Sequence, residues 1–161
     1  MVDAPQKKVI EPRDLSILRL ENPMALLRSE VASVFIAAFG DGRIAEPQDV
    51  LAWLYENVAT DDGLRVWLVR DKTPKVLGFI IVCLPCNPFT KDPHVAMLYA
   101  PEDDVKFAAV SHAVSECKAL GLNAATAINR SHLPDDAYIR AFSHWFDFEL
   151  QGSFFKVHFK E

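Results

Sequence analysis

The sequence predicts a single mixed α/β (α+β) domain, in which a mostly antiparallel central sheet of six to seven strands carries about four helices on its two faces. Three observations lead to this prediction. The chain has 161 residues, half of them hydrophobic, which suits one well-filled core. Apolar residues recur every three or four positions in stretches typical of helices. Short runs rich in β-branched and aromatic residues, typical of strands, lie between and after these stretches.

The first fourteen residues, Met1 to Asp14, predict an extended arm. They hold two prolines, mixed charge and a single apolar pair, Val9-Ile10. Such a segment cannot bury itself in a core, and free termini are ordered only where something ties them down. We therefore expect residues 15–161 to form the domain and the arm to dock onto a protein partner.

The first half of the domain predicts one strand and two helices. Leu15–Glu21 reads as a strand, and Asn22-Pro23 suit the N-cap and first position of a helix that runs to about Phe39. A second helix begins at Glu46-Pro47 and closes near Asp61. The apolar stripes of the two helices comprise Leu27, Val31, Val34, Phe35 and Ala38 in the first, and Val50, Leu51, Leu54 and Val58 in the second.

The middle of the chain predicts three strands and the longest helix. Arg65–Asp71 and Val76–Pro85 are rich in β-branched and aromatic residues and flank a short turn, a pattern that indicates a β-hairpin. His94–Ala100 follows as a third strand. Asp103-Asp104 then open a helix that keeps a three-four apolar spacing and ends at Gly121.

The end of the chain predicts a buried strand, a helix and a closing hairpin. Asn123–Asn129 is short, small and apolar, as suits a strand beneath helices. The next helix starts within Ser131–Asp136, where carboxylates in the first turn favour the helix dipole. Asp147–Gln151 and Phe154–Lys160 read as the two strands of the hairpin.

Charge and cysteine content exclude several classes of protein. Seventeen basic against twenty-two acidic residues give a net charge of −5, which argues against a nucleic-acid partner. No apolar run reaches the 18 residues of a membrane span, and no signal-peptide pattern opens the chain, so we expect neither a membrane partner nor secretion. Three cysteines are too few for a disulfide framework and favour a cytoplasmic, reducing environment. Cys83 and Cys86 form a C-x-x-C pair, which we interpret as reduced thiols because no second pair accompanies it.

No motif predicts a metal centre or a hydrolase. The five histidines show no metal-ligand spacing, and neither a G-x-S-x-G elbow nor a phosphate-binding P-loop is present. We therefore expect no metal.

The predicted order of elements, β-α-α-β-β-β-α-β-α-β-β, resembles the GNAT (N-acetyltransferase) superfamily over nearly everything after Asp14. The best-matching pieces are Leu98-Tyr99-Ala100-Pro101 leading into a helix, Asn129 at the end of the next strand, and the run Trp145–Glu149 before the closing hairpin. The resemblance implies an acyl-CoA site between the fourth strand and the following helix. Its candidate cofactor-binding residues are Leu98, Tyr99, Ala100, Lys106 and Asn129.

The sequence departs from the GNAT pattern at the turn that would cradle the cofactor pyrophosphate. Family members carry glycines there, which let backbone N–H groups approach the phosphates. This chain instead reads Pro101–Phe107, without glycine and with the carboxylates Glu102, Asp103 and Asp104. Like charges 4–8 Å apart cost about 2–4 kcal/mol per pair at an effective dielectric near 20, and Lys106 alone would not offset this.

A second departure concerns the general acid. Many family members place a tyrosine four residues before a Gly-Phe pair, where its hydroxyl protonates the departing thiolate. The corresponding position holds Ser143, whose hydroxyl is a poor acid. The other candidate catalytic residues are Tyr138, His144 and Glu102, the last as a base.

Two hypotheses about function follow. In the first, the chain is a pseudoenzyme, a non-catalytic GNAT-like structural or interaction module of a larger assembly that binds no cofactor. Its specific form is a phage-encoded protein, located in the cytoplasm or in the virus particle. In the alternative, it is a divergent acetyl-CoA-dependent N-acyltransferase whose primary-amine acceptor enters near Gly40–Arg43. The acidic turn favours the first hypothesis, since function is argued from the site and not from the fold.

Overall fold

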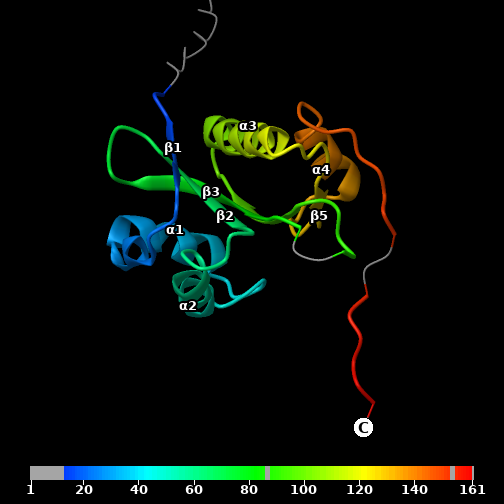
Figure 1. Ribbon diagram of the computed structural model, residues 1–161, viewed down its shortest axis with the longest axis horizontal. Helices are drawn as coiled ribbons and strands as arrows, with labels where there is room; N and C mark the ends of the chain where they lie inside the picture. The colour runs from blue at the N-terminus through cyan, green and yellow to red at the C-terminus, as the bar shows by residue number, and fades with distance from the viewer. Residues whose placement is uncertain (1–12, 86–87, 153–154, 161) are drawn as a thin grey trace, which may run out of the picture. The chain divides into compact units, whose positions relative to one another are not determined.

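A computed structural model describes residues 13–85, 88–152 and 155–160 of the chain. Its centre is a sheet of five strands in the order β1-β2-β3-β4-β5 (Figure 1). The strands are β1 (Ser16–Arg19), β2 (Leu64–Arg70), β3 (Val76–Cys83), β4 (His94–Tyr99) and β5 (Thr126–Ala127). The first four are antiparallel to their neighbours, and β5 pairs in parallel with β4. The mixed, mostly antiparallel sheet is therefore confirmed.

The first face of the sheet is covered by α1 (Ser29–Phe39) and α2 (Pro47–Asn57), as Figure 1 shows. A 3₁₀ helix, η1 (Pro23–Leu27), precedes α1, and Asn22 caps it by accepting a hydrogen bond from the Met24 backbone N–H at 3.0 Å. The single helix expected up to Phe39 is thus broken, because Arg28 between the two segments is extended, with φ −80° and ψ 134°. Most residues of the two apolar stripes pack as predicted, with Phe35 and Leu54 fully buried against β2 and β3. Leu27 is the exception: it ends η1 and is 68% exposed.

The second face is covered by α3 (Asp103–Ala119). Its buried residues follow the three-four spacing: Val105, Ala109, Val110 and Ala113. Most of them pack on the alternate residues of β2 and β3 that point to this face, such as Trp67 and Val82. Helices therefore lie on both faces, as expected. In the part of the chain that the structure describes, no helix is long and apolar enough to cross a membrane.

The prediction of six to seven strands was wrong, because the closing hairpin does not form within the described residues. Residues 147–151 and 155–160 have no strand conformation. Leu150, Phe155, Val157 and Phe159 are 92, 78, 76 and 96% exposed, so the alternating apolar pattern finds no face to pack on. An isolated two-stranded hairpin is at best marginally stable, which accounts for the difference. Asn123–Asn129 also shrinks to the two exposed residues of β5.

By their internal contacts the residues divide into two units, 1–130 and 131–161. The first holds the sheet with η1 and α1 to α3. The second holds α4 (Asp135–Ala141) and an aromatic cluster in which Tyr138 packs on Phe142 and Phe148 at ring-centroid distances of 5.0 and 6.2 Å. Of the expected arm, residues 1–12 lie outside the described part of the chain.

Candidate acyl-CoA site

The outer edge of β4 is open over most of its length. Among the described residues its pairing with β5 covers only His94 with Thr126 and Val95 with Ala127. β5 ends at Ala127, and the backbone of Ala96 to Tyr99 makes no ladder with it. Unpaired N–H and C=O groups along a strand edge can bind an extended ligand by backbone hydrogen bonds.

A β-bulge lies in β4 directly after the two residues that pair with β5. Ile81 of β3 pairs with Met97 and Val82 pairs with Val95, so Ala96 is an extra residue in β4. A bulge bends its strand and re-aims the backbone groups that follow it, and bulges are frequent beside binding sites. The bulge directly precedes the segment of β4 that leads to Leu98, Tyr99 and Ala100, three of the predicted cofactor-binding residues.

The end of β4 is held in place by two close contacts with β3. A Cβ on Gly78 would lie 2.5 Å from the Tyr99 carbonyl oxygen and 2.7 Å from Val105 Cγ1, so only glycine lets β3, β4 and the first turn of α3 meet. Phe79 stacks on Tyr99 at a ring-centroid distance of 5.9 Å. These contacts fix the position at which β4 passes into α3.

The acidic turn before α3 is bound by Arg13, a residue that the sequence analysis assigned to the arm. The Arg13 guanidinium donates from Nε to Asp104 Oδ2 at 2.8 Å and from Nη2 to Asp104 Oδ1 at 2.7 Å. The same Nη2 lies 2.7 Å from Glu102 Oε2. Lys106 Nζ lies 3.8 Å from Asp103 Oδ1. Three carboxylates therefore face two cations. With Arg13 bound the turn carries a net charge of about −1, whereas with Lys106 as the single cation it would carry −2.

The Arg13 contact also changes the titration of the turn. The hydrogen bond from Arg13 lowers the pKa of Asp104 below its ordinary value, against a smaller opposing effect of desolvation. The same pairing raises the pKa of Arg13, so this side chain stays charged at every accessible pH. Asp104 Oδ1 further accepts a hydrogen bond from the Val105 backbone N–H at 2.9 Å, which satisfies one donor at the start of the helix.

The loop between α1 and α2 is tied to the segment after β5. Arg43 Nη2 donates to the Arg130 carbonyl oxygen at 2.7 Å, and the Asp41 carboxylate accepts from the Arg43 backbone N–H at 3.0 Å. The predicted residue Asn129 directly precedes Arg130. The Gly40–Arg43 loop, where the sequence placed the acceptor, is therefore joined by a hydrogen bond to the segment that follows β5.

The predicted catalytic residues divide between the two units. Glu102 stands at the start of α3, with its carboxylate bound by Arg13. Tyr138, Ser143 and His144 lie in the second unit. Burial raises the pKa of Tyr138, which makes it a weaker proton donor, and Ser143 Oγ donates to the Arg140 carbonyl oxygen at 2.9 Å. His144 packs edge-on against Trp145 at 5.2 Å. The catalytic roles of these residues stay predictions.

Metal-ligating side chains and cysteines are the remaining groups that could carry chemistry. No cluster of three metal-ligating side chains exists among residues 13–85, 88–152 and 155–160. Of the C-x-x-C pair, Cys86 lies outside the described residues. Burial raises the pKa of the remaining half-buried thiol, Cys117, which lowers its reactivity.

Comparison with known proteins identifies the fold. No protein-family model and no curated protein matches the sequence. Solved structures do match: an aminoglycoside acetyltransferase from an uncultured soil metagenomic sample, in complex with trehalose, superposes with a TM-score of 0.66 at 15% identity, over 91% of this chain and 97% of that chain. AAC(6')-Iy in complex with the bisubstrate analog CoA-S-monomethyl-acetylneamine gives 0.67 at 10% identity, over 90 and 99%. The ribosomal-protein-alanine N-acetyltransferase from Brucella melitensis biovar Abortus 2308 gives 0.63 at 14% identity, over 91 and 100%.

The chain therefore has the GNAT fold, as the order of its elements indicated. The structure brings together Leu98, Tyr99, Ala100, Glu102 and Lys106 at the junction of β4 and α3. Sequence reasoning missed Arg13 as part of this site. Arg13 and Asp104 are 91 positions apart, and no local pattern marks an arginine in a proline-containing arm as the partner of a distant turn.

Proposed function

We propose that the protein is a divergent acyl-CoA-dependent N-acyltransferase that acts on a primary amine. The observation that carries the proposal is the outer edge of β4 after the bulge at Ala96, which pairs with no strand among the described residues. This part of β4 is followed closely by the start of α3. The pantetheine arm of an acyl-CoA is extended and carries amide groups, so it suits an unpaired strand edge. The likeness to acetyltransferase structures, one of them with a CoA-containing analog, supports the same proposal.

The residues of the site fit most of an acyl-CoA. The backbone groups of Leu98 to Ala100 would hold the pantetheine arm. Arg13 and Lys106 would face the phosphates, and among the described residues Arg13 Nη1 takes part in neither the hydrogen bonds nor the ion pairs of this side chain. A planar guanidinium suits a phosphate, and its remaining N–H groups offset part of the repulsion that the acidic turn exerts. Bound acyl-CoA would supply an activated thioester: attack of a neutral amine on its carbonyl carbon would form an amide and break the C–S bond, and the departing thiolate would take up the proton that the amine loses.

The acceptor amine would enter at the Gly40–Arg43 loop. The Asp41 carboxylate lies at this loop and is two-thirds exposed, with Arg43 Nε 3.9 Å from its Oδ2, so a cationic amine would share this carboxylate with Arg43. The hydrogen bond from Arg43 to Arg130 keeps the loop against the segment that follows β5. Because charge attraction between exposed groups is screened by salt, the affinity for the amine should fall as ionic strength rises.

A transfer assay tests the proposal. Purified protein is incubated with acetyl-CoA and a panel of primary amines that includes aminoglycosides, polyamines and amino-terminal peptides, and acetylated products are detected by mass spectrometry. We expect a product whose yield falls at least tenfold in the Asp41→Asn variant, with Asp135→Asn in the first turn of α4 as the matched control. Binding of acetyl-CoA without any product would favour a non-catalytic module that retains the cofactor. If acetyl-CoA does not bind and no product forms, the proposal is contradicted and the interaction module is favoured.

A further inference from the structure

A histidine and a threonine meet where β4 pairs with β5. His94 begins β4, Thr126 begins β5, and the two residues are register partners in the parallel pair. Their side chains are in contact, since His94 Nδ1 lies 2.9 Å from Thr126 Oγ1. His94 is half-buried and Thr126 is exposed, so the pair can be reached from solvent. Neither residue belongs to the cofactor-binding or catalytic residues predicted from the sequence.

Register places His94 on the face of the sheet that α1 and α2 cover. His94 pairs with Cys83, and directly opposed residues of antiparallel strands point to the same side. Cys83 packs on the core cluster beneath α1 and α2, together with Ala96 and Met97 of β4. The Gly40–Arg43 loop lies between the same two helices. The imidazole is therefore on the face from which the acceptor amine would enter.

The edge of β4 that would hold acyl-CoA begins beside His94. The phosphates would lie at the start of α3, and the pantetheine arm would follow the unpaired edge of β4 back to Ala96. At about 3.3 Å per residue, Ala96 to Pro101 spans about 16 Å, a length comparable to that of the extended arm. The thioester would then lie near Ala96, about 7 Å along the strand from His94. A histidine side chain, with one water molecule, can cover this distance.

The contact with Thr126 suits the tautomer that a general base needs. When Nδ1–H of His94 donates to Thr126 Oγ1, the lone pair that accepts a proton is on Nε2. The hydroxyl oxygen still accepts from Nδ1–H after Nε2 is protonated, so both charge states of the ring keep one orientation. Imidazole is also the side chain best matched to proton transfer near neutral pH. Glu102, the base predicted from the sequence, is instead bound by Arg13.

We propose that His94 is the general base of the transferase, with Thr126 as its positioning residue. This inference rests on the proposed acyl-CoA-dependent function. His94 Nε2 takes one proton from the ammonium form of the acceptor, directly or through a water molecule. The neutral amine attacks the thioester carbonyl carbon, the C–N bond forms and the C–S bond breaks. The leaving thiolate takes up the proton that the amide nitrogen loses, and the imidazolium returns its proton to solvent.

NMR spectra of the histidine rings in the full chain, recorded with and without acetyl-CoA, test the position of His94. We expect its ring signals to shift saturably, and the His94→Gln spectrum identifies them by their absence. His112 on α3 is the internal control, because it packs against Trp67 on the opposite face of the sheet at a ring-centroid distance of 5.4 Å. If acetyl-CoA raises Tm saturably and the His94 signals stay in place, the proposal is overturned and the proposed function stands.

Turnover gives the second measurement, with acetyl-CoA and the primary amine of the panel that is acetylated best. His94→Gln should lower kcat about 100-fold or more and leave the dissociation constant of acetyl-CoA within about threefold. Imidazole added to His94→Ala should restore part of its turnover, which a purely structural role of His94 would not allow. Thr126→Val should lower kcat about tenfold, and Thr126→Ser, which keeps the hydroxyl, should turn over as wild type.

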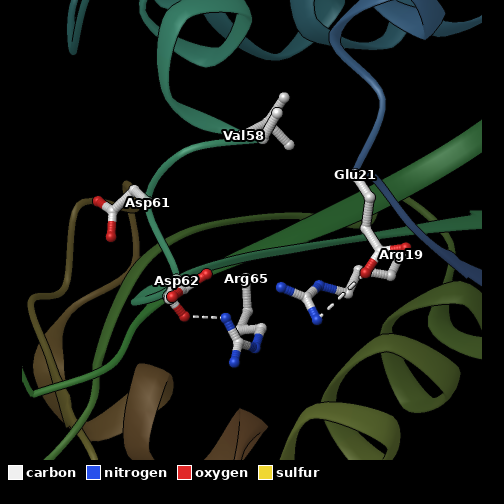
Figure 2. A pocket seen from close by; sticks show the side chains of 7 residues that line it. Arg19, Glu21, Val58, Asp61, Asp62 and Arg65 are labelled. Atoms are coloured by element: carbon white, nitrogen blue, oxygen red, sulfur yellow. Dashed lines mark hydrogen bonds and ion pairs between the residues drawn. The ribbon is translucent and has the colours of Figure 1, made fainter.

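The matched control is Arg65→Gln, which removes a charge at the same end of the sheet but on the opposite face. Arg65 pairs with Val82, which packs beneath α3. Figure 2 shows Arg65 in the wall of a polar hollow of about 490 Å³, where it donates to the Asp62 backbone carbonyl oxygen. This variant should turn over as wild type.

Two results separate the role of His94 from the proposed function. Product from wild type together with turnover by His94→Gln within about threefold of it would overturn the role of His94 alone. If the wild type neither binds acetyl-CoA nor forms product, the proposed function and the role of His94 fail together.

Discussion

At the scale of single residues, Arg13 decides how the acidic turn before α3 is interpreted. Considered alone, Glu102, Asp103 and Asp104 repel phosphates. With Arg13 bound to two of them at 2.7–2.8 Å, they hold a guanidinium at the start of α3. The carboxylates themselves could be read from the sequence, but the partner that neutralises them could not, because their contact depends on the tertiary fold.

Replacing Arg13 by Gln should lower stability in a pH-dependent way. The Arg13 contact lowers the pKa of Asp104 in the folded protein, so its contribution is present above the unfolded pKa near 3.8 and is lost as pH falls through the folded pKa. The difference in unfolding free energy between wild type and Arg13→Gln should be constant from about pH 8 to pH 5 and shrink below about pH 4.

Urea unfolding at a series of pH values measures this difference. Asp104→Asn is the matched control, since it removes the titrating group, and in its background Arg13→Gln should have a smaller effect. A wild-type-to-variant difference that stays the same down to pH 2.5 would show that the contact with Asp104 is not made in solution.

At the scale of elements, the strands and helices that bury an apolar face were predicted best. The β2–β3 hairpin was identified from its β-branched and aromatic residues around a turn, and α3 from its apolar spacing; both contribute to the core. The break between η1 and α1 was missed, since Arg28 carries no local signal for an extended conformation. The closing hairpin was predicted from an alternating pattern that has no packing partner among the described residues, and pattern alone cannot reveal this.

The tail offers a direct test of its exposure. Serine at both Phe155 and Phe159 should change the free energy of unfolding by less than about 0.5 kcal/mol, because both side chains are almost fully exposed. Phe79→Ala, at the centre of the aromatic stack with Phe35, should cost about 3–5 kcal/mol and serves as the reference. A loss above about 1 kcal/mol from the tail variant would mean that the predicted hairpin forms after all.

Gly78 gives the corresponding test for the junction of β4 and α3. Gly78→Ala should destabilise the protein by about 1–3 kcal/mol, because the added Cβ meets the Tyr99 carbonyl oxygen at 2.5 Å. The amide signals of Tyr99 and Val105 should also shift in its NMR spectrum. Gly121→Ala is the control: its φ of +79° makes alanine strained there, at a cost of about 1 kcal/mol, but its surroundings are open. If the amide signals of Tyr99 and Val105 shift no more in Gly78→Ala than in Gly121→Ala, the close packing at Gly78 is contradicted.

At the scale of the whole molecule, the GNAT fold was predicted from the order of elements and is supported by structural neighbours that share only 10–15% of its sequence. The fold by itself does not establish an activity. The sequence alone favoured a non-catalytic module because the glycine-containing turn is absent. The open edge of β4 and the Arg13 contact now favour a transferase, and both depend on residues distant in the sequence.

The most direct test is thermal or urea unfolding with and without an excess of acetyl-CoA. At a hundred times its dissociation constant a ligand of the folded state stabilises by about 2.7 kcal/mol, so the free energy of unfolding should rise by this amount in the wild type and in Arg65→Gln. Arg13→Gln should need a higher concentration of acetyl-CoA for the same rise. No rise at millimolar acetyl-CoA, or a rise that disappears only in Arg65→Gln, would contradict an acyl-CoA site along β4.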